Sequence, residues 1–174
     1  MSGVTTRSAR IGVLRPGIVI AAFVLALVSL SAGPLADPAP VQAGTAENME
    51  AMLLSWINDA RAKKRLPALH TTAKLVDLAG DRARKMAEVN EMRHIKCLSC
   101  KLNRRGIEWD HCGEVIAYTT YPWGTQAAQS IFNGWKGSSF HWGLLMSPNF
   151  DKIGLGVAYR SSAHKTYAAG ILVG

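Results

Sequence analysis

The sequence lacks several motifs that would assign a chemistry directly. It has no HExxH zinc-protease motif, and the "GLG" at residues 154–156 lacks the third glycine and the following helix of a dinucleotide-binding loop. No segment of the chain repeats, and no low-complexity segment occurs beyond the N-terminal leader. These absences argue against an HExxH metalloprotease, a dinucleotide-binding protein and a repeat protein.

Acidic residues are also scarce, with 12 Asp and Glu against 20 Lys and Arg, so the formal charge is +8 at pH 7. Three of the positive charges precede an apolar N-terminal run, and many others lie in "RAKKR" and in positions up to Arg105. A basic exported domain could lie against anionic lipid or wall polymers, whereas nucleic acid is a poor candidate outside the cell. The simplest interpretation is a solvated helix face that favours solubility.

The N-terminus has the organisation of an export signal. Three arginines precede "GIVIAAFVLALVSLSAG", and "VQAG" then offers small residues for cleavage after Ala43. The apolar run is shorter than the roughly 20 residues of a membrane span, which favours a cleaved signal peptide over an uncleaved anchor. We therefore expect a signal peptide and Pro/Ala-rich leader over residues 1–43, and one secreted domain over residues 44–174.

The chain has only three cysteines, Cys97, Cys100 and Cys112, and they lie close together. In an oxidising compartment they predict one disulfide that closes a short loop and one remaining thiol. Because His94 and His111 are nearby, a zinc site of three cysteines and one histidine is the alternative. Export favours the disulfide, and the sequence does not determine which two cysteines pair.

Hydrophobic periodicity predicts the helices and strands. Helical spacing extends over residues 49–65 and again from Thr72 to about residue 92, and a polar, cysteine-bearing loop follows. "GEVIAYTT" predicts a strand, a third helix begins at Thr125, and a short fourth helix, "FHWGLLM", stops before Pro148. Two further strands, joined by "SSAH", form a C-terminal hairpin.

The first strand of that hairpin has two different faces. Ile153, Leu155, Val157 and Tyr159 alternate with Gly154, Gly156 and Ala158. A face without side chains lets a helix approach the sheet closely, while the branched face packs against a second layer. We therefore predict an α+β fold, a three-layer α/β/α sandwich around a small, mainly antiparallel sheet.

Three residues at the ends of predicted elements could carry chemistry: His94, Glu114 and His141. A helix N-terminus disfavours a protonated imidazole, so His141 is suited to metal ligation. Two imidazoles and one carboxylate make a three-ligand set with an open position for water. Spacing alone gives a weak signal for a shared site, and buried or surface histidines are the alternative.

The nearby Ser138 and Ser139 are explained as helix caps, and Trp135 and Trp142 as core or cleft-wall residues.

Several longer motifs occur in a recognisable order. They are INDARAKKRLPAL (57–69), LAGDRARKMAEVNEMRH (78–94), GEVIAY (113–118), WKGSSFH (135–141) and NFDKIGLGVAY (149–159). Together they resemble the CAP superfamily of cysteine-rich secretory, antigen 5 and pathogenesis-related 1 proteins, which includes bacterial SCP-like extracellular proteins. The resemblance spans about residues 50–174 and marks residues 44–174 as a single CAP/SCP domain.

The resemblance implies an α/β/α sandwich whose cleft holds two histidines and two acidic residues. The histidines correspond to His94 and His141, and one acid corresponds to Glu114. Val115 replaces the asparagine that follows this glutamate in the family, and no acidic residue stands near Trp135. A His-Glu-His trio is left, which can hold a divalent cation, zinc above all, if water completes the shell.

The expected function is that of a secreted, non-enzymatic binding module with this cation-holding cleft. Its partner would be an extracellular lipid, a sterol or a protein, with membrane contact only transient or through an uncleaved anchor, and we expect a monomer. Whether the chain is an enzyme stays open, and the alternative is a metal-dependent peptide or ester hydrolase in which Glu114 acts as the base. In a third interpretation the trio only forms hydrogen bonds within the cleft.

Overall fold

The computed structural model describes residues 45–174, so the signal peptide and leader expected over residues 1–43 lie outside the described residues. The elements are α1 (Ala46–Lys63), α2 (Ala73–Val89), α3 (Leu98–Arg104), β1 (Cys112–Thr119), α4 (Thr125–Gly137), α5 (Ser139–Leu145), β2 (Lys152–Arg160), η1 (Ser161–Ala163) and β3 (Lys165–Val173). None of the helices described over this range combines the length and the apolar character needed to cross a membrane.

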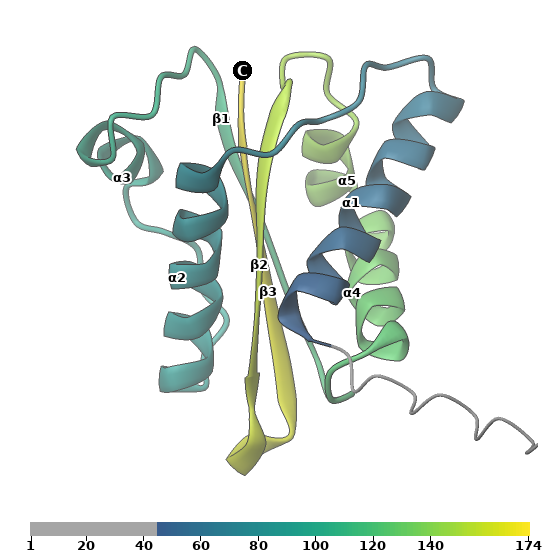
Figure 1. Ribbon diagram of the computed structural model, residues 1–174, viewed down its shortest axis with the longest axis vertical. Coiled ribbons are helices and arrows are strands. Elements are labelled where there is room, and N and C mark those ends of the chain that lie inside the picture. Colours follow the sequence, from purple (N-terminus) through teal and green to yellow (C-terminus); the bar gives the residue numbers. More distant parts are fainter. Residues whose placement is uncertain (1–44) are drawn as a thin grey trace, which may run out of the picture. The chain divides into compact units, whose positions relative to one another are not determined.

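A three-stranded antiparallel sheet, in the order β1-β3-β2, forms the middle layer. Helices α2 and α3 lie on one side of it, and α1, α4 and α5 lie on the other (Figure 1). The predicted three-layer α+β sandwich with a small antiparallel sheet is confirmed. Since β3 is central, β1 and β2 are both edge strands, and each has one edge free for contacts with loops and side chains.

The glycine face of β2 lies against α2, as the alternation predicts. A Cβ placed on Gly154 would lie 2.1 Å from the Leu75 carbonyl, and one on Gly156 would lie 2.3 Å from the Ala79 carbonyl carbon. On the opposite face, the branched residues of β2 join the core formed with α1 and α4. The two faces therefore place the two helix layers at different distances from the sheet.

A buried arginine in α1 holds the segment between α5 and β2. Arg61 is only 1% exposed, and its guanidinium donates to the carbonyls of Pro67, Leu145, Ser147 and Phe150 at 2.7 to 3.0 Å. These bonds satisfy backbone acceptors that would otherwise be buried without a donor. They also fix the C-terminal end of α5, the helix that carries His141.

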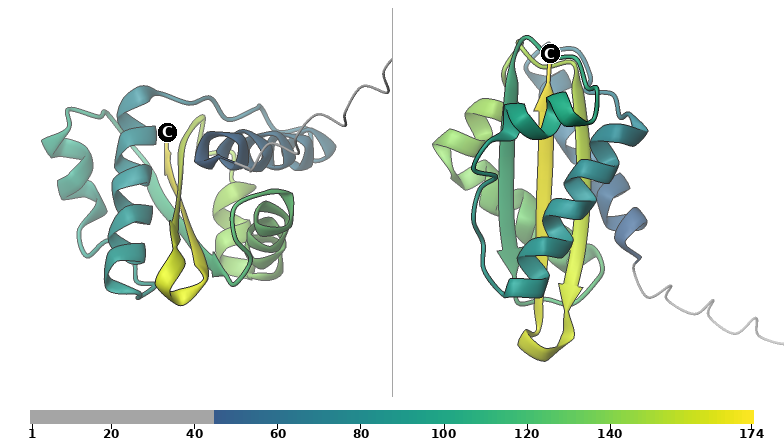
Figure 2. Two further views of the ribbon diagram at one scale, coloured as in Figure 1. Left: turned by 60° about the horizontal axis from the view of Figure 1, so that its bottom comes forward. Right: turned by 90° about the vertical axis from the view of Figure 1, so that its left-hand side faces the viewer.

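The segment between α2 and β1 differs from the prediction. The second helix ends at Val89, where Asn90 takes a left-handed conformation with φ of 54°. The predicted polar loop contains a short helix, α3, which lies across one end of the sheet and contacts β1 (Figure 2). Seven residues rich in polar and charged side chains give too short an apolar pattern to reveal a helix by periodicity.

The cysteines form one disulfide, as predicted, and the structure identifies the pair as Cys97 and Cys100. Cys112 is the free thiol. The sulfur of Cys97 also accepts from the Cys100 backbone N–H at the start of α3. With two of the three thiols oxidised, the alternative zinc site of three cysteines and one histidine does not form.

Candidate functional site

Glu114 lies at the bottom of the site, on edge strand β1. Its side chain is only 5% exposed, and Oε2 accepts from the Ile95 backbone N–H at 2.9 Å and faces His94 Nδ1 at 2.7 Å. The other oxygen, Oε1, lies 3.4 Å from Nε of Arg82 on α2. The buried carboxylate is therefore stabilised by a guanidinium, an imidazole and a backbone amide.

His94 belongs to the loop that follows α2. The loop leaves the helix at Asn90, whose side chain accepts a hydrogen bond from the Tyr167 hydroxyl at 2.8 Å. A carboxylate only accepts hydrogen bonds, so Nδ1 of His94 must carry the proton in its contact with Glu114. In the neutral ring the lone pair then lies on Nε2, as in histidines that a carboxylate orients toward a metal.

His141 comes from the opposite helix layer, in the first turn of α5. Ser138 caps this helix, because its hydroxyl accepts from the His141 backbone N–H at 3.4 Å. Burial lowers the pKa of His141, the neighbouring His94 lowers it further, and Glu114 opposes both effects. Nε2 of His141 is buried and has no hydrogen-bond partner within the described chain. A neutral imidazole with an unpartnered ring nitrogen is suited to a ligand.

The two histidines meet beside β1. Their ring centroids lie 5.9 Å apart, and Phe140 packs edge-on against both rings. Since Zn–N bonds measure about 2.0–2.1 Å, two imidazoles that share one ion have centroids within about 6.5 Å of each other. The separation of His94 and His141, 5.9 Å, is inside this limit, so the spacing of the two rings is compatible with a shared ligand.

The structure thus brings His94, Glu114 and His141 together, although they come from a loop, a strand and a helix. Within residues 45–174, no group of three or more His, Cys, Asp or Glu side chains is arranged to hold a metal ion. Both oxygens of Glu114 already face donors, which suits this residue to orienting His94. Ligation of a metal by all three residues stays a prediction.

Two residues at this site were missed by the sequence analysis. Arg82 lies on α2 between Leu78 and Met86 at intervals of four residues, and its side chain is only 12% exposed. A charged residue inside the apolar stripe of a helix was the available signal. Nothing in the sequence marked Phe140, which is 63% exposed, as a site residue, because an aromatic residue next to a histidine is common.

The other candidates have the roles expected from their context. Trp135 is fully buried in the core, and Trp142 lies half-buried against Phe132 with ring centroids 5.9 Å apart. Ser138 serves as a helix cap. The side chains of the remaining histidines are exposed; these are His70, His111 and His164.

Comparisons with known proteins identify the fold and the family. Residues 54–172 match the CAP family, described as the cysteine-rich secretory protein family. The comparison with curated protein sequences finds no match.

Three solved structures illustrate the similarity. An extracellular protein containing an SCP domain from Bacillus anthracis is 19% identical over 74% of this chain, with a TM-score of 0.62, and the chain covers 41% of that protein. An outer surface protein from Borrelia burgdorferi is 19% identical over 73% of this chain and 92% of its own, with a TM-score of 0.64. NaASP2, determined with Zn²⁺, is 13% identical over 76% of this chain and 82% of its own, with a TM-score of 0.57.

At these identities the structural similarity establishes the fold alone. The family match covers well over half of the 174 residues and includes the strand, the loop and the helix that carry Glu114, His94 and His141. The chain belongs to the CAP family of cysteine-rich secretory proteins.

Proposed function

We propose that this protein is a secreted, non-enzymatic binding module that holds a divalent cation between His94 and His141. The observation that carries the proposal is the buried, unpartnered Nε2 of His141 beside His94, whose Nδ1 is fixed by Glu114. A bound cation would supply a Lewis acid with positions open to water or a partner. NaASP2, which has the same fold, was determined with Zn²⁺, and the Bacillus anthracis protein is described as extracellular.

Within this site the chain's own residues would divide the work. Glu114 orients the His94 ring and keeps its proton on Nδ1, while α5 presents His141 from the other layer. The nearby Phe140 packs edge-on against both rings, while the His94 side chain stays 49% exposed and therefore open to solvent. The hydrolase alternative requires a carboxylate free to accept a proton from water. Glu114 is poorly suited to that step: Oε2 already faces His94 and the Ile95 N–H, and Oε1, although it accepts no hydrogen bond, is buried where water does not reach it.

Zinc titration by calorimetry on the disulfide-bonded protein tests the cation site. The double variant His94→Ala, His141→Ala should lower the affinity by at least about a hundredfold, because both nitrogen ligands are lost. The matched control is His70→Ala, His111→Ala, which removes two exposed imidazoles and should bind zinc like the unaltered protein. Equal zinc affinity in the two double variants would remove the proposal, provided that thermal unfolding shows both to be folded.

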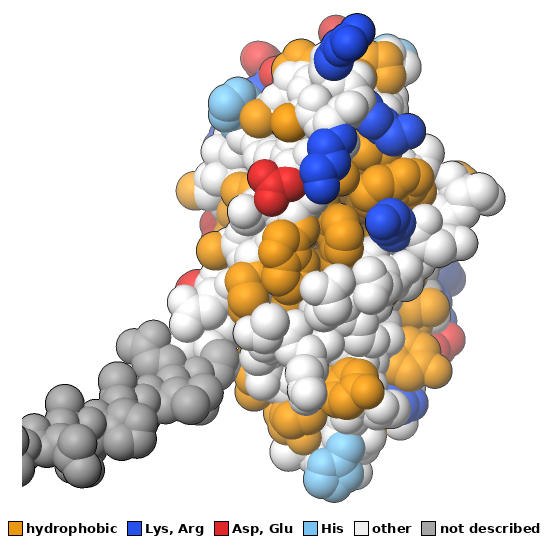
Figure 3. All heavy atoms as spheres, turned by 90° about the vertical axis from the view of Figure 1, so that its right-hand side faces the viewer, with side chains coloured by type: hydrophobic (Ala, Val, Ile, Leu, Met, Phe, Trp, Pro, Cys, Tyr) orange, Lys and Arg blue, Asp and Glu red, His pale blue; other side chains and the backbone are white. Residues whose placement is uncertain are grey.

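A groove between α1 and α4 supports a lipid as the partner. It has a volume of about 410 Å³, and its walls include Trp56, Phe132 and Trp142, which form successive edge-to-face contacts at 5.8 and 5.9 Å. Three lysines and one acid also line it: Lys63, Lys64, Lys136 and Asp59, which leaves a surplus of two positive charges. An apolar patch flanked by basic side chains is visible on this face (Figure 3). Aromatic walls with basic groups fit an apolar chain that ends in an anionic head.

Binding of a fluorescent long-chain fatty acid tests the groove. Trp142→Ala removes part of one wall and should weaken binding about tenfold, given the area of an indole ring. Tyr121→Ala is the control, because this half-exposed aromatic residue is not among those lining the groove. If both variants bind the fatty acid as tightly as the unaltered protein, the lipid partner is not held in this groove.

A further inference from the structure

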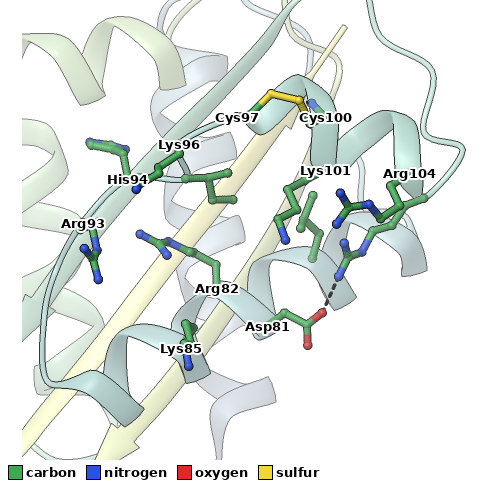
Figure 4. A pocket seen from close by; sticks show the side chains of 13 residues that line it. Asp81, Arg82, Lys85, Arg93, His94, Lys96, Cys97, Cys100, Lys101 and Arg104 are labelled. Carbon is green, nitrogen blue, oxygen red and sulfur yellow. Dashed lines mark hydrogen bonds and ion pairs between the residues drawn. A yellow bond between two sulfur atoms is a disulfide. The ribbon is translucent and has the colours of Figure 1, made fainter.

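A second pocket lies on the opposite side of the sheet, between α2, α3 and the loop that joins them. Its volume is about 540 Å³, and seven Lys or Arg side chains and one acid line it. The basic residues are Arg82, Lys85, Arg93, Lys96, Lys101, Arg104 and Arg105, and the acid is Asp81. Figure 4 shows these side chains around the pocket, with the Cys97–Cys100 disulfide at its rim. The formal surplus is six positive charges.

Neighbouring acids do not neutralise this charge. Asp81 is shared between Arg84 and Arg105, while Lys85 and Arg93 make only exposed pairs with Glu88 and Glu91. Such surface pairs contribute little. Even if Glu88, Glu91 and Glu114 are counted, the pocket keeps a surplus of three positive charges.

Three of the cations have no ion-pair partner within residues 45–174; they are Lys96, Lys101 and Arg104. All three are exposed, so solvent screens their mutual repulsion, and they stay available to an anion that enters the pocket.

Arg82 supplies a second, independent sign of a missing acceptor. Its Nη2 is buried and has no hydrogen-bond partner within the described chain, although Nε lies 3.4 Å from Glu114. A buried N–H without an acceptor costs about 1–3 kcal/mol, and more when the group is charged. In Figure 4 the Arg82 side chain extends from α2 toward the loop that carries Arg93 and Lys96. An oxyanion in the pocket would provide the acceptor after a shift of this side chain, because Nη2 has no surface open to the pocket.

We propose that this pocket binds an anion that carries two or more phosphate groups, either free or as the head group of a lipid. Four of the seven cations are arginines, whose planar guanidinium matches a phosphate with paired hydrogen bonds. The apolar side chains of Leu78 and Ile95 line part of the wall and strengthen charge attraction by excluding water. The positive charge surplus of the pocket is larger than the negative charge of one phosphate group. We therefore expect a ligand with more than one phosphate group.

Titration with inorganic tripolyphosphate tests the pocket. Lys101→Gln, Arg104→Gln removes two exposed, unpaired cations from α3 and should weaken binding by about tenfold or more. The control, Lys152→Gln, Lys165→Gln, removes two positive charges from β2 and β3, where they line neither this pocket nor the groove, and should leave the affinity unchanged. Equal weakening in the two variants, or no binding by the unaltered protein at low salt, would overturn the proposal.

The pocket must also be separable from the proposed cation site. His94 lines this pocket and also belongs to the proposed cation site, whereas His141 does not line the pocket, so His141→Ala removes a residue of the cation site alone. Tripolyphosphate should bind this variant as it binds the unaltered protein. If the affinity falls instead, the anion is held through a metal at the histidines, which contradicts a phosphate pocket between α2 and α3.

Vesicles distinguish the two sources of phosphate. Sedimentation with phosphatidylcholine vesicles, with and without phosphatidylinositol bisphosphate, measures attachment to a lipid head group that carries more than one phosphate. Attachment that tripolyphosphate competes away, and that Lys101→Gln, Arg104→Gln abolishes, supports a lipid source. Tripolyphosphate binding without attachment supports a free ligand. Attachment that is lost only in Lys63→Gln, Lys64→Gln assigns the membrane contact to the groove between α1 and α4, and overturns a lipid source for this pocket.

Discussion

At the scale of single residues, the buried carboxylate of Glu114 links the two proposed ligand sites. Oε2 orients the histidine of the proposed cation site, and Oε1 lies beside Arg82, which borders the cationic pocket. The same side chain therefore contacts a residue of each proposed ligand site. A change at Glu114 would disturb both sites at once, and so would one at His94, which lines the pocket; changes at His141, Lys101 or Arg104 act on one site each.

Arg61 shows how a single residue can position a site without touching it. Its four carbonyl acceptors include Leu145, the last residue of α5, and Ser147 in the segment that follows. The orientation of His141 in the first turn of α5 therefore depends on a side chain of α1. The charge remains buried because hydrogen bonds to four carbonyls replace its hydration.

Site residues could be predicted from the sequence where they stand in a recognisable motif, and not otherwise. His94, Glu114 and His141 stand in motifs that resemble a known family, and the structure places them together. The pocket residues stand in no such motif. In the sequence they look like a solvated basic segment; they include Arg93, Lys96, Lys101 and Arg104. The sequence shows neither the turn at Asn90 nor the short helix α3 that brings these side chains together.

At the scale of elements, the close contact between α2 and β2 depends on glycine. The alternation in β2 predicted this contact correctly because a period of two separates the faces of a strand unambiguously. The structure adds that both helix-facing glycines meet backbone atoms of α2, which cannot move aside as a flexible side chain would.

A methyl group at Gly156 tests this contact. Its Cβ would lie 2.3 Å from the Ala79 backbone, so we expect Gly156→Ala to lower the free energy of unfolding by about 3 kcal/mol or more. The control is Gly134→Ala in α4, where the added methyl meets nothing within 4 Å. That substitution should raise stability by about 0.5–1 kcal/mol through helix propensity. Urea unfolding of both variants measures the difference, and a Gly156→Ala variant as stable as the unaltered protein would contradict the close packing.

At the scale of the whole molecule, the sites occupy different parts of one sandwich. The proposed cation site lies beside edge strand β1, the groove lies in the α1 and α4 layer, and the cationic pocket, which shares His94 with the proposed cation site, lies in the α2 and α3 layer. Sequence predicted the layers because hydrophobic patterns encode which face of each element is buried. It could not predict the pocket and the groove, because these depend on how neighbouring elements are spaced in three dimensions.

The other edge of the sheet is closed by Glu50 of α1. Its Oε1 accepts from the Val157 backbone N–H on the outer edge of β2 at 3.0 Å. An unpaired strand edge invites association with another chain, and this contact helps to cover it. Burial raises the pKa of Glu50 from its ordinary value of 4.5 to about 7; the hydrogen bond from Val157 opposes this, and Glu47 adds to it.

Global stability should therefore depend on pH through Glu50. Because the folded state binds this proton more tightly than the unfolded state, the stability contributed by protonated Glu50 is complete below about pH 4.5 and is lost as the pH rises through about 7. Solvent screens the half-buried group, so the expected loss is about 1–2 kcal/mol.

Glu50→Gln keeps an acceptor for Val157 without the charge, and should match the unaltered protein in acid and exceed its stability above neutral pH. Glu50→Ala, which lacks the acceptor, should be less stable than Glu50→Gln throughout. Urea unfolding across this pH range measures the difference between each variant and the unaltered protein, and a difference for Glu50→Gln that does not change with pH would show that the Glu50 carboxylate is not destabilised by burial.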